Sequence, residues 1–99
     1  MRFWVYILQC SDGSYYVGHT DNLEVRIAAH QDGTFGGYTS SRRPETLSYA
    51  EAFDSRDDAF HRERQIKKWS RGKKEALIRQ DWRELQRLSR GAHPSTGSG

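Results

Sequence analysis

Arg26 and His30 are the first residues of this chain whose types and spacing suit a chemical task. They stand four positions apart in a helical pattern, so their side chains would project from one helix face. The planar guanidinium of arginine can donate two parallel hydrogen bonds to a phosphate, and histidine exchanges a proton near neutral pH. The pair therefore suits the handling of a phosphate ester. The simpler interpretation is two surface residues on a short helix.

Glu63 is the second candidate, because its helical neighbours are largely apolar. Ala59 and Phe60 precede it by four and three positions, and Ile66 follows it by three. This spacing turns the carboxylate toward, or beside, the helix face that packs on a sheet. An ionised carboxylate is costly to remove from water unless a cation compensates it. A hard divalent metal would do so, and the alternative is a structural salt bridge, for example with Arg26.

Tyr6, Tyr16 and Gly18 form a third group, in two strand-like runs near the start of the chain. The two tyrosines can lie beside each other if the strands pair in the right register. Two core tyrosines with satisfied hydroxyls are the simpler interpretation. Gly18, just after the second run, would permit close approach of the backbone to the following helix or to a phosphate.

These residues need a scaffold, and the sequence predicts three strands and three helices. Turn residues Ser11 to Gly13 join the first two strands into a hairpin, and Asp21 or Asn22 caps the first helix. The order predicts an α+β fold with a three-stranded antiparallel sheet flanked by helices. One domain should span residues 1–90, with a mobile loop at 33–44 and a disordered polar tail at 91–99. The predicted strands are 3–9, 14–18 and 46–53, and the predicted helices are 23–30, 55–69 and 73–88.

The charge of the chain is unevenly distributed. Up to Ser55 there are four Lys/Arg against seven Asp/Glu, and from Arg56 onward there are twelve against six. A basic half can attract a polyanion such as nucleic acid, or an anionic surface, although it can also be a solvated helix face. The residues predicted to contact nucleic acid are Gly18, His19, Arg42, Arg43, Lys67, Lys68, Arg71, Lys73 and Lys74.

Composition excludes several other classes. The longest apolar run, residues 3–8, is too short to span a membrane and follows no basic leader, so we expect a cytoplasmic protein. Cys10 is the single cysteine and has no internal disulfide partner, and the four scattered histidines do not resemble a zinc site. No long apolar surface stripe demands a dimer, so we expect a monomer.

Over roughly residues 3–80 the chain resembles the GIY-YIG nuclease superfamily. Its two name motifs correspond to Val5-Tyr6-Ile7, in place of Gly-Ile-Tyr, and Tyr16-Val17-Gly18. The tract Gln65-Ile66-Lys67-Lys68-Trp69-Ser70, with the basic residues that follow it, is similar to the small single-domain bacterial members, which are UPF0213-like. The resemblance implies an active site of Tyr6, Tyr16, Arg26, His30 and Glu63.

The same resemblance implies metal-dependent hydrolysis of phosphodiesters. Because the sequence shows no recognition helix or zinc finger that would read bases, we expect selection by strandedness or shape, with single-stranded or branched DNA favoured. One Mg²⁺ or Mn²⁺ would be bound by Glu63, and Arg26 would offset charge in the transition state. Tyr16 is the general base by family analogy, but Tyr6 or His30 could assist, and His30 could be the base itself. Repair, recombination or control of incoming DNA are the processes it would serve. A noncatalytic nucleic-acid-binding module is the main alternative, and a basic protein-interaction domain is a more distant one.

Overall fold

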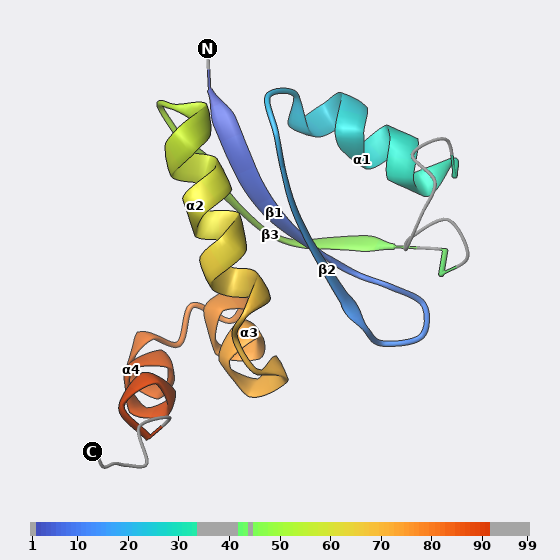
Figure 1. The fold of residues 1–99 in the computed structure, drawn as a ribbon. Helices are drawn as coiled ribbons and strands as arrows, with labels where there is room; N and C mark the ends of the chain where they lie inside the picture. Colours follow the sequence, from blue (N-terminus) through green and yellow to red (C-terminus); the bar gives the residue numbers. More distant parts are fainter. Residues whose placement is uncertain (1, 34–41, 44, 92–99) are drawn as a thin grey trace. The chain divides into compact units, whose positions relative to one another are not determined.

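The computed structural model describes residues 2–33, 42–43 and 45–91, and contains three strands and four helices there. The predicted loop at 33–44 and tail at 91–99 fall almost wholly outside these residues. The chain divides into two compact units, Met1–Lys67 and Lys68–Gly99. The elements are β1 (Phe3–Gln9), β2 (Tyr15–Thr20), α1 (Leu23–Gln31), β3 (Thr46–Phe53), α2 (Arg56–Lys67), α3 (Arg71–Ile78) and α4 (Trp82–Gly91) (Figure 1).

The first unit is built on an antiparallel sheet with the strand order β2-β1-β3, which confirms the predicted α+β fold. The central strand β1 is the core of this unit, because its residues 5–8 are almost fully buried. Helix α2 packs against all three strands. Strand β2 is longer than predicted, and Gly18 therefore lies inside it rather than just after it.

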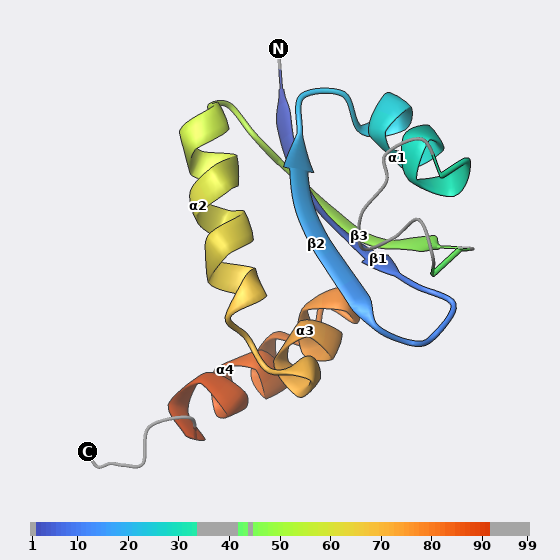
Figure 2. The same ribbon diagram turned by 45° about the vertical axis from the view of Figure 1, so that its right-hand side comes forward.

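The two faces of the sheet carry different helices. Tyr6 pairs with Gly18 in the β1–β2 register, and Val5 pairs with His19. Because neighbouring residues of a strand point to opposite faces, Tyr6 and Gly18 share one face, and Val5 and His19 share the other. The Tyr6 face meets α1 through His30, and the His19 face meets α2. Figure 2 shows α1 and α2 on opposite sides of the sheet.

Local hydrogen bonds fix where the helices of the first unit begin. The side chain of Asn22 accepts a hydrogen bond from the backbone N–H of Val25 at 3.2 Å, and so caps α1. The hydroxyl of Ser55 accepts one from the N–H of Asp58 at 3.1 Å at the start of α2. These contacts satisfy backbone donors that have no partner within a helix, and the first confirms the predicted cap at Asn22.

The second unit corrects the prediction of a single helix over 73–88. The chain forms α3 and α4 instead, with Gln80 between them at a φ of 57°, in the left-handed region. The Asp81 carboxylate accepts a hydrogen bond from the N–H of Glu84 at 3.1 Å and so starts a new helix. Because this cap favours the start of a new helix, it competes with continuation of α3. The spacing of apolar residues over 73–88 could not reveal that competition. Ser70 likewise caps α3 through the N–H of Lys73 at 3.2 Å.

Among the described residues, no helix is both long and apolar enough to cross a membrane.

Candidate active site

The first cluster of the candidate site is formed by two tyrosines and a histidine on the α1 face of the sheet. The Tyr6 hydroxyl lies 2.9 Å from Nε2 of His30, and both side chains are completely buried. The ring of Tyr16 lies 5.0 Å from that of His30 and 6.3 Å from that of Tyr6, between centroids. His30 is therefore a buried partner of the tyrosines and not a surface residue of a short helix.

Gly18 makes this cluster possible. A Cβ at this position would lie 2.7 Å from the Tyr6 hydroxyl oxygen, 2.8 Å from Cζ of the same ring and 3.0 Å from Tyr16. Any side chain here would therefore displace the Tyr6 ring. The sequence predicted a close approach of Gly18 to a helix or a phosphate, whereas in the structure the space above Gly18 is occupied by the two tyrosines. Its contact with nucleic acid stays a prediction.

Arg26 completes the cluster from the preceding turn of α1. It is half-buried and donates a hydrogen bond to the Tyr6 hydroxyl. Because a guanidinium can only donate, the Tyr6 oxygen accepts from Arg26, and its own hydrogen can point to Nε2 of His30. His30 then carries its proton on Nδ1.

Glu63 forms the second cluster, on the α2 face. It lies with Ala59 and Ile66 on the buried side of α2, as predicted, and its side chain is only 9% exposed. One carboxylate oxygen pairs with Nδ1 of His19, and the other lies 2.6 Å from the ammonium of Lys67, one helical turn later. The compensating charge therefore comes from Lys67, with His19 as a hydrogen-bond partner, in place of the Arg26 that the sequence suggested.

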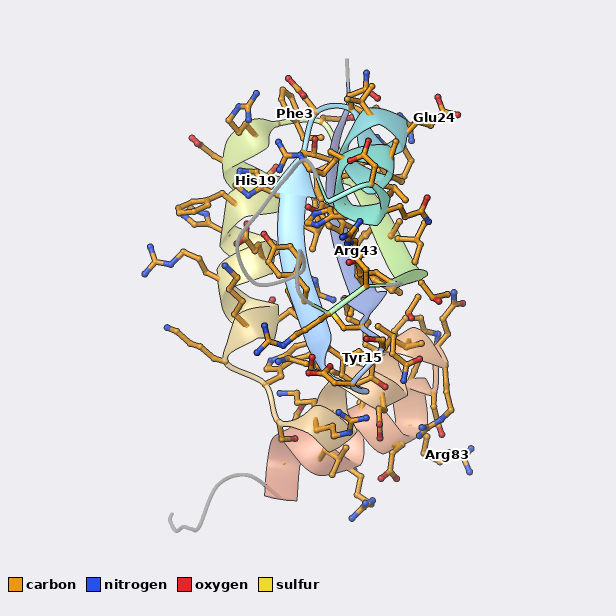
Figure 3. The ribbon with its side chains drawn as sticks, turned by 90° about the vertical axis from the view of Figure 1, so that its right-hand side faces the viewer. Phe3, Tyr15, His19, Glu24, Arg43 and Arg83 are labelled. Carbon is orange, nitrogen blue, oxygen red and sulfur yellow. The ribbon has the colours of Figure 1, made fainter. Side chains whose placement is uncertain are left out.

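The two clusters meet around β2, which is an edge strand of the sheet. Tyr16 and His19 are separated by an odd number of positions along this strand, so their side chains point to opposite faces of the sheet. Tyr16 faces α1 and His19 faces α2. Figure 3 shows β2 between these two helices, with His19 on the α2 side. Burial is the main cause that raises the pKa of both Tyr6 and Tyr16, and the charge of Glu63 adds a smaller contribution in the same direction. Four of the five predicted catalytic residues thus lie together on the α1 face, and Glu63 lies on the α2 face of the same sheet.

Burial sets the protonation states of this region. It raises the pKa of Tyr6 well above its usual value, with a further contribution from Tyr16. It also raises the pKa of Tyr16, against an opposing effect of the Lys67 charge. Burial and the nearby Arg26 lower the pKa of His30. At neutral pH both tyrosines therefore keep their protons, and His30 is neutral and able to accept one.

The residues around Glu63 could provide one ligand to a divalent ion, but they could not surround the ion with protein ligands alone. Within the described ranges, no group of three or more His, Cys, Asp or Glu residues could hold a metal. Mg²⁺ is commonly bound through one or two carboxylates, with substrate phosphates and water completing its shell. The ammonium of Lys67 already places a positive charge on Glu63, and its side chain is 53% exposed and free to swing away. Glu63 therefore fits a site that substrate would complete.

Two residues of this site carry functions that the sequence analysis had not assigned. His19 and Lys67 were predicted only to contact nucleic acid, yet both bind Glu63 directly. The four-residue spacing of Glu63 and Lys67 could have indicated the ion pair. The contribution of His19 depends on the strand register and on the packing of α2, and no local pattern reveals either.

The loop arginines have contacts of their own. Nε of Arg42 lies 3.1 Å from the carboxylate of Asp12 in the β1–β2 turn. The guanidinium of Arg43 lies 3.0 Å from where a Cβ on Gly33 would be, just beyond α1 (Figure 3). Their binding to nucleic acid stays a prediction.

Of the four predicted basic residues of the second unit, two are exposed and two are half-buried. Lys68 and Arg71 are exposed, and Lys74 is half-buried. The ammonium of Lys73 lies 4.4 Å from the centre of the Trp69 ring. Exposed cations of this kind could hold a polyanion, but the geometry does not identify one.

Comparisons with known proteins show which family this chain resembles. A family model described as the GIY-YIG catalytic domain matches residues 2–76, a range that includes all five candidate residues. The UPF0213 protein of Halobacterium salinarum is 48% identical over 74 residues, which cover 75% of this chain and 96% of the relative. The UPF0213 protein of Staphylococcus haemolyticus is 46% identical over 77 residues, which cover 78% and 94%. These names state no substrate, metal or pathway.

Two solved structures are also similar. The solution NMR structure of a UPF0213 protein from Bacillus halodurans has a TM-score of 0.52 and 42% identity, covering 79% of this chain and 83% of that one. The solution NMR structure of a protein from E. faecalis has a TM-score of 0.58 and 35% identity, covering 81% and 85%. Both support the α+β fold described above.

Proposed function

This chain belongs to the GIY-YIG catalytic domain family, and we propose that it is a DNA endonuclease that depends on one divalent metal ion. Membership of the family implies nuclease activity in general. The finer proposal rests on one observation above all: a nearly buried carboxylate, Glu63, is held by His19 of β2, and the opposite face of the same strand carries Tyr16 of the tyrosine–histidine cluster. An ion pair that served only to stabilise the fold would not need to lie near the tyrosine–histidine cluster.

Glu63 is the residue that would bind Mg²⁺ or Mn²⁺. When bound, the ion supplies positive charge to the phosphate and to the departing oxygen. Lys67 would have to leave the carboxylate for the ion to bind, and its side chain, 53% exposed, has alternative positions in solvent. Arg26 donates to phosphate oxygens, where negative charge accumulates in the transition state.

The tyrosine–histidine cluster handles the proton of the attacking water. Tyr16 is half-buried, whereas Tyr6 and His30 are fully buried, so Tyr16 is the tyrosine that can contact the water. Because its pKa is raised, Tyr16 cannot remain as a phenolate, so it gives up its own hydroxyl proton as it takes the proton of the attacking water. The hydroxyl proton of Tyr16 passes to the Tyr6 oxygen while Tyr6 gives its own proton to Nε2 of neutral His30, which is the final acceptor.

DNA is the proposed substrate, with single-stranded or branched forms favoured, and the basic residues of the second unit would bind its backbone. Lys68, Arg71 and Lys74 can neutralise phosphates without reading sequence. We place the enzyme in the cytoplasm, as a monomer, in repair, recombination or control of incoming DNA.

The decisive experiment compares the wild type with Glu63→Gln on labelled single-stranded, duplex and branched DNA and on RNA. Each reaction is run with Mg²⁺, with Mn²⁺ and with a chelator. Glu51→Gln is the matched control, because Glu51 is also an ion-paired carboxylate of the first unit, bound by Arg62 at 3.3 Å. We expect metal-dependent cutting in the wild type and the control, and none in Glu63→Gln.

Two other results would overturn the proposal. Salt-dependent DNA binding without cutting under any condition would identify a noncatalytic binding module. Absence of salt-dependent binding would identify a protein-interaction domain instead. Cutting of RNA alone would keep the nuclease and reject DNA as its substrate.

A further inference from the structure

Phe60 is an exposed aromatic residue beside the proposed metal ligand. It lies on α2 three positions before Glu63, and the sequence placed it toward the sheet with Ala59 and Ile66. In the structure it is 41% exposed, whereas those two neighbours are completely buried. A single exposed apolar side chain is ordinary on a protein surface, so its position and its neighbours must decide whether it has a function.

The neighbours of Phe60 connect it to the site. Its ring lies 5.5 Å from that of His19, edge to face, and His19 pairs with Glu63. The guanidinium of Arg64, one helical turn later, lies 5.6 Å from the centre of the ring. A phenyl ring open to solvent, a cation beside it and the metal-binding carboxylate thus lie together on one part of α2.

This combination suits a nucleotide. An exposed ring can stack on the face of any base, and an adjacent arginine can bind the phosphate of the same strand. A hydrophobic peptide would use the ring alone and would leave Arg64 without a complementary charge. The observations therefore favour a nucleic-acid strand over a protein as the occupant of this surface.

We propose that Phe60 stacks on an unpaired base next to the phosphate that is cut, and that Arg64 binds a neighbouring phosphate. The inference rests on the proposed nuclease function and explains how the enzyme would select its substrate. In a duplex the faces of each base are covered by its neighbours, so a side chain reaches a base face only where the strand is unstacked. Phe60 would thereby favour single-stranded or branched DNA over continuous duplex.

The test compares Phe60→Leu and Phe60→Tyr with the wild type by fluorescence anisotropy in the presence of chelator, so that no cleavage occurs. The ligands are a single-stranded oligonucleotide, a duplex, and a strand of abasic sites that keeps the phosphates but lacks the bases. Stacking on one base corresponds to about a five- to 150-fold change in affinity. We expect Phe60→Leu to weaken binding of the normal single strand about tenfold within that range, and to leave binding of the abasic strand and the duplex unchanged. Phe60→Tyr, which keeps the ring, should bind like the wild type.

Phe3→Leu is the matched control. Phe3 is also an aromatic residue of the first unit with a guanidinium over its ring, that of Arg56 at 4.9 Å, but it lies at the start of β1. Its substitution should leave all three affinities unchanged. Circular dichroism and thermal melting would verify that each variant is folded.

Several outcomes would overturn the inference. It fails if Phe60→Leu weakens binding of the abasic strand as much as the normal strand, or if the wild type does not distinguish those two ligands. It also fails if Phe60→Leu binds every ligand like the wild type. If the wild type stacks on bases but cuts no DNA with any metal, the proposed nuclease function fails while the binding inference stands.

Discussion

Residues 1–67 and residues 68–91 use charged side chains in opposite ways. In the first unit the reactive groups are buried and held by specific partners, as for His30 with Tyr6 and Glu63 with Lys67. In the second unit the basic residues are mostly exposed. The sequence carries the same contrast, with eight Lys/Arg against ten Asp/Glu in residues 1–67, and eight against three in residues 68–99.

The difference follows from what each task requires. Proton transfer and transition-state stabilisation need groups that are fixed in position and removed from water, which strengthens their interactions. Binding of a polyanion needs only a high density of accessible cations, whose release of counterions drives association. Substitutions of the buried groups of the first unit should therefore change the rate of cleavage at saturating DNA, and substitutions of the exposed cations of the second should change affinity.

Gly18→Ala should have the largest effect. The added methyl group would collide with the hydroxyl and Cζ of Tyr6, and the buried ring would have to move away from His30. A displacement of about 1 Å in a catalytic group can cost roughly 100-fold in rate. We expect a loss of that order in single-turnover cleavage at saturating DNA.

Gly72→Ala is the corresponding change in the second unit. A Cβ there would lie 3.9 Å from Leu88, which is an ordinary contact. Cleavage at saturation should be unchanged. If Gly18→Ala and Gly72→Ala reduce the cleavage rate equally, residues of both units determine that rate.

Removal of cations from the second unit should have the next largest effect, on binding alone. For Lys68→Gln combined with Lys74→Gln, we expect the slope of log affinity against log salt to fall by roughly two, because about one counterion is released per phosphate contact. The single-turnover rate at saturating DNA should stay at the wild-type value. Binding titrations at several salt concentrations would measure the change.

Arg2→Gln with Arg56→Gln is the control for that variant. It removes two positive charges from the first unit, at exposed positions outside the candidate site. Its salt slope should resemble that of the wild type. An equal reduction in both double variants would show that net charge alone governs binding, and the proposed division between units would be wrong.

The pH dependence of stability should reveal the buried state of His30. Because burial and Arg26 lower its pKa in the folded protein, the unfolded chain takes up a proton first as the pH falls below about 6.5. The free energy of unfolding therefore decreases as the pH falls from that value to the lower pKa of the folded state. The slope contributed by one group is at most about 1.4 kcal/mol per pH unit.

Urea denaturation between pH 8 and pH 5 would test this, with His30→Gln beside the wild type. The variant should lose less stability on acidification, since it lacks this proton uptake. His61→Gln, at an exposed position of α2, should keep the wild-type slope. If all three proteins have one slope, His30 is not held neutral by burial.

The sequence predicted those parts of the molecule that depend on local patterns. The bounds of β1 and β3 and the cap of α1 were recovered, because β-branched and aromatic runs and capping chemistry act within a few residues. The break at Gln80 was missed because the helical spacing of apolar residues continues across it. The break comes from the side chain of Asp81, which caps a new helix. The exposure of Phe60 and the pairing of His19 with Glu63 were missed because both depend on how α2 packs on the sheet.

Two matched helix caps provide the smallest and most direct comparison of the units. Asn22 at the start of α1 and Ser70 at the start of α3 each accept one backbone hydrogen bond at 3.2 Å. Replacement of either residue by alanine should reduce the free energy of unfolding by about 1 kcal/mol. Only α1 carries Arg26 and His30, so fraying of its first turn should also slow cleavage a few-fold at saturating DNA, whereas Ser70→Ala should leave that rate unchanged. Urea denaturation would measure the loss of stability in both variants, and single-turnover assays would measure the cleavage rate. An equal slowing by Ser70→Ala would show that the catalytic geometry also depends on the second unit.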